Sequence, residues 1–151
     1  MPGFPLRILS AAAAAALLAG AAPRLAADLV DLPGDEAARA LQARGTVHSE
    51  AAALVLHTRM SSAEIHPAPD RDLAIGRALF ARGRDAAPAA AAAFVRGLER
   101  APADGRAWAE YAEALVAAFG RSGDAADALD MSWRRAPHDP AARRIRDALV
   151  R

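Results

Sequence analysis

The sequence predicts an all-α fold, a stack of antiparallel helical hairpins behind an amino-terminal signal or anchor helix. Three observations support this class. Of the 151 residues 54% are hydrophobic but only 5% are aromatic, and much of the apolar fraction is alanine. The core is therefore thin, and the helices around it lie close together. No segment alternates apolar and polar residues as a strand would, and turn signals divide the chain into short helical segments.

Two absences exclude several kinds of chemistry. All 19 basic residues are arginine, and the chain contains neither lysine nor cysteine. A phosphate-binding loop of the Walker type, Schiff-base or thiolate catalysis, disulfides and cysteine-ligated metals are excluded. Most of the arginines alternate along the chain with the 18 acidic residues. This interleaving of charges argues against a surface that binds nucleic acid. We therefore expect a protein that is not an enzyme, has no cofactor and takes no small-molecule substrate.

Residues 1–22 form the first element and have the layout of a signal peptide or membrane anchor. Arg7 precedes the charge-free run 8–22, which as a helix spans about 22 Å, short of the roughly 30 Å hydrocarbon layer. Ala19, Gly20 and Ala21 supply a small-x-small cleavage pattern. A cleaved signal is the favoured interpretation and an uncleaved anchor the alternative. Both place residues 23–151 outside the cytoplasm, either periplasmic or anchored to the inner membrane; an alanine-rich helix of a cytoplasmic protein is the third possibility.

After a linker at 23–33, the chain is expected to form an atypical hairpin at 34–66 and, beyond a second linker at 67–70, a longer helical array. The expected helices span 34–44, 49–60, 71–83, 88–100, 105–119, 124–135 and 140–150. Four of these starts carry an aspartate that could accept the free backbone N–H groups of the first helical turn; the four are Asp70, Asp104, Asp124 and Asp139.

A size pattern recurs in the second half of the chain, with a small residue, a large apolar one, a second small one and a proline at fixed spacing. It is present as Ala90, Phe94, Gly97 and Pro102, and again as Ala125, Leu129, Ser132 and Pro137. The helix expected at 105–119, between the two copies, carries Trp108, Tyr111, Ala112 and Leu115. This resembles the tetratricopeptide repeat, a 34-residue unit of two antiparallel helices. The resemblance covers two units at 71–139, and 140–151 takes the place of a capping helix.

The resemblance implies a concave face made by the first helix of each unit, which binds an extended peptide or a partner helix. By position in the repeat, this face comprises Asp72, Ile75, Leu79 and Arg82 in the first unit and Arg106, Ala109, Glu113 and Val116 in the second. The function so implied is a non-enzymatic exported adaptor or scaffold that binds a protein or peptide partner in the bacterial cell envelope.

Two alternative functions remain open. Glu50, His57 and Glu64 recur at intervals of seven on one helical face and could hold a metal or ligand, although Ser61 and Glu64 also form a capping box that would end the helix between them. The other alternative is a structural accessory subunit of a homo-oligomer or membrane complex.

The carboxyl-terminal segment 134–151 holds six arginines against two aspartates. Arg143, Arg144 and Arg146 are candidates for a basic surface that contacts an acidic partner or anionic headgroups. The simpler interpretation is the solvated outer face of a capping helix.

Overall fold

A computed structural model describes the backbone of residues 4–44 and 49–151 and most of their side chains from residue 15 onward. All regular structure in these ranges is helical, and the predicted all-α class is confirmed. The elements are α1 (Phe4–Arg44), α2 (Ser49–Ile65), α3 (Pro69–Phe80), the short 3₁₀ helix η1 (Arg84–Ala86), α4 (Ala87–Arg100), α5 (Gly105–Phe119), α6 (Gly123–Arg135) and α7 (Pro140–Val150).

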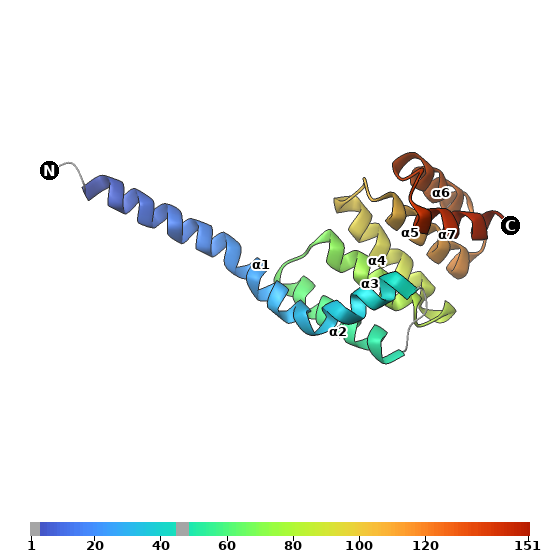
Figure 1. The fold of residues 1–151 in the computed structure, drawn as a ribbon, viewed down its shortest axis with the longest axis horizontal. Helices are drawn as coiled ribbons and strands as arrows, with labels where there is room; N and C mark the ends of the chain where they lie inside the picture. Colours follow the sequence, from blue (N-terminus) through green and yellow to red (C-terminus); the bar gives the residue numbers. More distant parts are fainter. Residues whose placement is uncertain (1–3, 45–48) are drawn as a thin grey trace.

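Consecutive helices pack in pairs, α1 with α2, α3 with α4, and α5 with α6, and each pair packs on the next through α2–α3 and α4–α5 contacts. The last helix, α7, lies against α5. Figure 1 shows these pairs following one another in chain order, with the amino-terminal half of α1 projecting from the stack as a single helix.

The predicted linker at 23–33 is wrong, because α1 runs through Pro23 and Pro33 without a break. The helix changes direction where it joins the stack (Figure 1). Pro33, inside the helix, cannot donate the hydrogen bond of a helix interior. Gly34 follows, and a side chain there would collide with Thr58 of α2. The close packing of α1 on α2 that Gly34 permits outweighs the helix-breaking tendency of the proline.

Helix α2 continues to Ile65, so the break predicted at the Ser61–Glu64 capping box does not occur. The neighbouring Ser62 is fully buried, and its hydroxyl donates to Asp31 of α1 at 2.6 Å. Helix α3 spans Pro69–Phe80, whereas the predicted helix spans 71–83. It therefore begins two residues earlier and ends three residues earlier than predicted, and residues 66–68 connect it to α2. The starts and ends of α4 to α7 lie within one residue of prediction.

Two of the four predicted aspartate caps are confirmed. The Asp104 carboxylate accepts from the backbone N–H groups of Arg106 and Ala107, at 3.1 and 2.9 Å, and Asp139 caps α7 in the same way. Asp70 and Asp124 instead lie in the first turn, because the helices begin earlier and their N-caps are Ala68 and Ser122.

Replacing Asp104 with alanine is expected to lower the free energy of unfolding by about 1 kcal/mol, because two N–H groups lose their acceptor. Asp124→Ala is the matched control, since it removes only a favourable charge near the first turn and should cost a few tenths of a kcal/mol. Urea titrations of both variants test this, and equal costs would contradict it.

The core is built mainly from alanine, as the composition suggests. In the α3–α6 region, Phe94 and Leu98 of α4 and Leu115 of α5 supply the bulk among buried alanines. Gly76 of α3 faces Phe94 so closely that a Cβ atom would lie 3.0 Å from the ring. Small residues thus let the helices approach, and a few large side chains fill the remaining space.

Candidate functional site

A groove with a volume of about 470 Å³ opens between the first and second hairpins; we call it the interhairpin groove. Its apolar lining consists of Ala38, Leu41, Val55, Leu73 and Ala74. Its charged lining consists of Asp35, Arg39, Arg59, Asp70, Arg77 and Asp104. These residues come from α1, α2 and α3, with Asp104, the N-cap of α5, as the one contribution from the third hairpin. The groove therefore forms where the first two hairpins meet.

A buried ionic network fixes the α1–α2 side of the groove. The Asp31 carboxylate, almost completely buried, binds Arg59 of α2 at 2.5 Å and Arg71 of α3 at 2.8 Å. Arg59 also binds Asp35 at the groove, again at 2.5 Å. One arginine therefore links the interior of the stack to the lining of the groove.

A second network fixes the α3–α5 side. Glu110 of α5 accepts from Arg77 of α3 at 2.8 Å and from Arg106, one turn earlier in α5, at 3.0 Å. Glu113 lies one turn further along α5. Burial raises the pKa of the Glu113 carboxyl group, and the negative charge of Glu110 raises it further.

The raised pKa of Glu113 predicts a pH dependence of stability. As pH rises from the ordinary value of 4.5 to the higher folded-state pKa, the folded protein holds a proton that the unfolded chain has lost. The free energy of unfolding therefore falls across that range. Glu113→Gln should remove this pH-dependent decrease in the free energy of unfolding, and the variant should be more stable than the wild type at pH 7. Urea midpoints at pH 4 and pH 7 test this, and an unchanged pH slope would contradict it.

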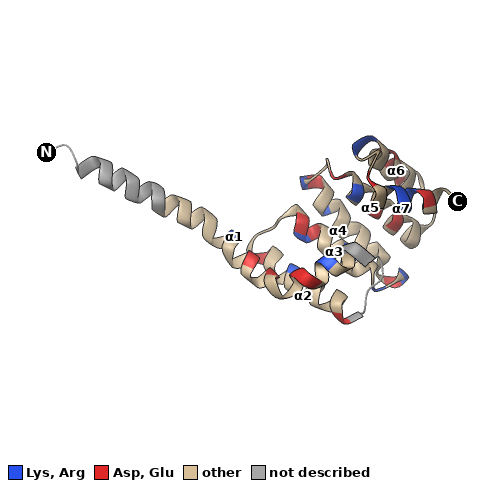
Figure 2. Ribbon diagram, in the orientation of Figure 1, with Lys and Arg blue, Asp and Glu red and all other residues tan. Residues whose placement is uncertain are grey.

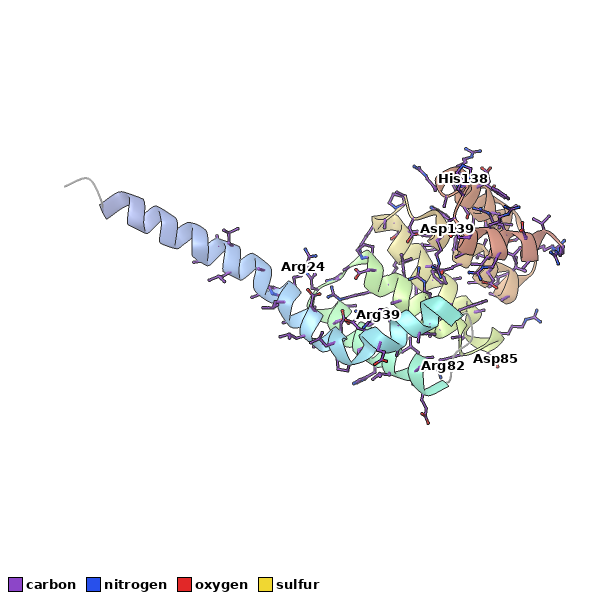
Figure 3. The ribbon with its side chains drawn as sticks, in the orientation of Figure 1. Arg24, Arg39, Arg82, Asp85, His138 and Asp139 are labelled. Carbon is purple, nitrogen blue, oxygen red and sulfur yellow. The ribbon has the colours of Figure 1, made fainter. Side chains whose placement is uncertain are left out.

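The structure corrects the predicted concave face on α3. Asp72 and Ile75 are buried, Leu79 packs against the core, and Arg82 lies beyond the end of the helix; Figure 3 shows Arg82 on the turn that also carries Asp85. Asp72 binds Arg96 and Arg100 of α4 and does not face a partner. The groove is instead lined by Asp70, Ala74 and Arg77, on a different face of α3.

The physical reason is a two-residue error in helix register. Ser132 of α6 donates to the carbonyl of Gly105, the first residue of α5, at 2.7 Å. In the preceding hairpin Gly97 packs beside Pro69, the first residue of α3. These matching contacts relate α3 to α5 by 36 residues, whereas the sequence prediction used 34. Since two residues turn a helix by about 200°, the predicted face was rotated toward the core.

On α5 the predicted face is partly retained. Arg106, Glu113 and Val116 are partly exposed, but Ala109 is completely buried and cannot contact a partner. The groove residues Asp35, Arg39, Arg59, Asp70 and Arg77 were not predicted as site residues. Three of them belong to the hairpin that showed no repeat signature, and Asp70 and Arg77 lie on a face of α3 other than the predicted one.

The candidate basic surface at the carboxyl terminus loses Arg146, which is fully buried. Arg143 and Arg144 are exposed, and Arg143 lies 3.7 Å from Asp147. Figure 2 shows basic and acidic residues interspersed over the stack. Of the three predicted arginines, two remain on the surface of α7.

The metal hypothesis gains no support from the geometry. Glu50, His57 and Glu64 are all exposed on the continuous helix α2. Within the described part of the chain, no group of three His, Asp or Glu residues could hold a metal ion. His48 lies outside the described residues.

No protein-family model, no curated protein and no solved structure matches this chain. Among the residues that the structure describes, no helix is both long and apolar enough to cross a membrane. What the fold and the groove establish is an all-helical protein of stacked helix pairs with a mixed-charge groove between two of them.

Proposed function

We propose that this protein is a non-enzymatic, tetratricopeptide-repeat-like adaptor that binds a peptide segment of a partner protein in the interhairpin groove. The observation that carries the proposal is the groove itself, an apolar floor bordered by three arginines and three aspartates. Such a lining suits an extended segment with alternating apolar and charged side chains.

Equivalent contacts in successive hairpins support the repeat interpretation. Gly97 and Ser132, which match in the size pattern, each pack on the first residue of the preceding helix in their own hairpin. With the 36-residue offset, Ile75, Gly76 and Leu79 of α3 take the places of Tyr111, Ala112 and Leu115 of α5. The large, small, large pattern therefore recurs in α3 as well.

Two charges at the groove support a charged peptide as the ligand. Asp70 and Arg39 have no ion-pair partner among the described residues, and Arg39 donates only to the Asp35 backbone carbonyl at 3.3 Å. Figure 3 labels Arg39 on the part of α1 that lies along the stack. An acidic and a basic side chain of a bound segment could pair with these two residues at little desolvation cost.

The groove proposal is tested with Ala74→Arg, which places a long cation on the groove floor. Ala92→Arg, at an exposed position of α4, is the control. Tagged protein is purified from a native membrane and periplasmic extract, and accompanying proteins are measured by mass spectrometry. We expect a protein that is retained by the wild type and Ala92→Arg and reduced on the order of tenfold by Ala74→Arg. Identical protein sets for all three, with both variants folded by circular dichroism, would reject the groove.

The same proposal places the stack outside the cytoplasm, with the start of α1 as an export signal or anchor. From residue 15 onward, where side chains of α1 are described, Ala27 is the first buried residue, and residues 15–26 are all exposed. Figure 1 shows this segment projecting from the stack. The charge-free run predicted as a signal therefore lies ahead of every described residue that contributes to the core.

A chain that starts at Ala22 is expected to have a free energy of unfolding within about 0.5 kcal/mol of that of the full chain, because residues 15–21, the part of the removed segment with described side chains, are all exposed. Chemical denaturation of both chains measures the difference. The export half of the proposal is tested separately, by sequencing the amino terminus of protein recovered from periplasm, membrane and cytosol. Recovery from the cytosol with Met1 intact would reject it.

A further inference from the structure

A second groove lies on another part of the stack, between α4 and α6 above α5, with a volume of about 510 Å³. We call it the aromatic groove, because Trp108 and Tyr111 of α5 both line it, with Leu98 and Met131 among its apolar residues. It shares no lining residue with the interhairpin groove. Its volume is within the range of sites that enclose a small ligand or a few side chains.

The aromatic groove carries negative charge only. Glu99 of α4 and Asp124 and Asp127 of α6 line it, and no arginine does. None of the three carboxylates has an ion-pair partner among the described residues. The nearest candidates along α4 are engaged elsewhere, because Arg96 and Arg100 both bind Asp72 of α3.

The two rings give this negative groove a further feature that suits a cation. Trp108 and Tyr111 meet edge to face, with centroids 6.1 Å apart, and the indole N–H of Trp108 donates to the Pro102 carbonyl at 3.0 Å. The indole N–H therefore already has a hydrogen-bond acceptor within the protein. Burial and the charge of Asp124 raise the pKa of the Tyr111 hydroxyl, consistent with a carboxylate close to that ring.

We propose that the aromatic groove binds a basic segment of a partner protein, with an arginine or lysine side chain held against Trp108 and Tyr111 and paired with Glu99, Asp124 and Asp127. A ring face attracts a cation, and three unpaired carboxylates around it favour positive charge and disfavour negative charge. A compact metal ion does not fit this arrangement, because no three carboxylates in the described chain are grouped closely enough to hold one. The inference does not depend on the function proposed for the interhairpin groove.

The test uses the full chain and two synthetic eight-residue peptides, alike except that one has two arginines where the other has two glutamates. The indole N–H signal of Trp108 is followed by two-dimensional NMR during titration, and Trp133, on the exposed side of α6, is the internal reference. We expect the arginine peptide to shift the Trp108 signal and leave Trp133 unmoved, and the glutamate peptide to shift neither. Raising the salt concentration should weaken the binding, because exposed charges are screened.

Conservative variants separate the groove from general surface charge. Asp127→Asn should weaken arginine-peptide binding about three- to fivefold, and Asp127→Asn with Glu99→Gln about tenfold or more. Asp130→Asn is the matched control, since Asp130 is on the same helix and pairs with Arg134 outside the groove; it should leave binding unchanged. The inference is overturned if Trp108 does not respond, if both peptides bind equally, or if Asp130→Asn weakens binding as much as Asp127→Asn. Because Ala74→Arg does not touch this groove, its effect reports on the proposed function alone.

Discussion

Replacing Asp31 with alanine is expected to lower the free energy of unfolding by about 3–5 kcal/mol. Asp31 lies at the junction of the first three helices, where its carboxylate binds Arg59 and Arg71 and accepts from the Ser62 hydroxyl. Arg71 is itself buried, with its side chain 3% exposed. Removing the carboxylate takes the one buried anion away from two largely buried guanidinium groups, and each keeps only a more exposed carboxylate, Asp35 for Arg59 and Asp28 for Arg71. Burying a charge without full compensation is costly.

Asp28→Ala is the control for this prediction. Asp28 also pairs with Arg71, at 2.6 Å, but its side chain is 57% exposed, so its loss should cost less than about 1 kcal/mol. Urea denaturation of the two variants, followed by circular dichroism, measures both costs. If Asp31→Ala were no more damaging than Asp28→Ala, the network would not be what holds the first hairpin on the second.

Replacing Arg146 with alanine is expected to cost about 2–4 kcal/mol, from lost charge-assisted hydrogen bonds and lost packing. The buried guanidinium donates to the backbone carbonyls of Ser132, Ala136 and Pro137 and to the Ser132 hydroxyl, and it lies 4.0 Å from the centre of the Trp133 ring. Its charge is therefore opposed by the negative end of α6 and a ring face. The Arg146 side chain therefore holds α7 against the end of α6.

Arg143→Ala tests whether this effect is specific to the buried position. Arg143 is 70% exposed, so its loss should change stability by less than about 0.5 kcal/mol. Arg146→Lys should recover only part of the loss, because an ammonium group cannot reach several carbonyls as a planar fork does. Thermal unfolding of the three variants measures the order. Full recovery by lysine would mean that charge alone matters at this position.

The sequence was most informative where several local signals agreed. For α5 and α7 the aspartate caps and the helical pattern predicted the observed bounds. For α1 the prediction was wrong, since a linker was expected at 23–33 while a helix forms through both of its prolines. The outcome there depends on contact with α2, a partner that no local rule includes.

The candidate sites also depend on contacts between helices that local sequence signals do not include. The sequence placed arginines and aspartates on the helices, but it could not say which of them would pair inside the stack. Asp72 and Arg146 illustrate this, since both were predicted at a surface and both are buried. Their burial depends on the rotation of α3 and on the docking of α7 against α5, and a two-residue change in a connecting turn is enough to alter such a rotation.

By itself, the sequence determined that this protein is helical, because alanine content, helix caps and the absence of alternating segments act within one or two turns of chain. Only the tertiary structure decided which helix faces are open. That outcome depends on contacts between residues far apart in sequence, such as Asp31 with Arg71 and Arg77 with Glu110. The interhairpin groove and the aromatic groove both lie where separate helices meet, so neither exists until the stack has formed.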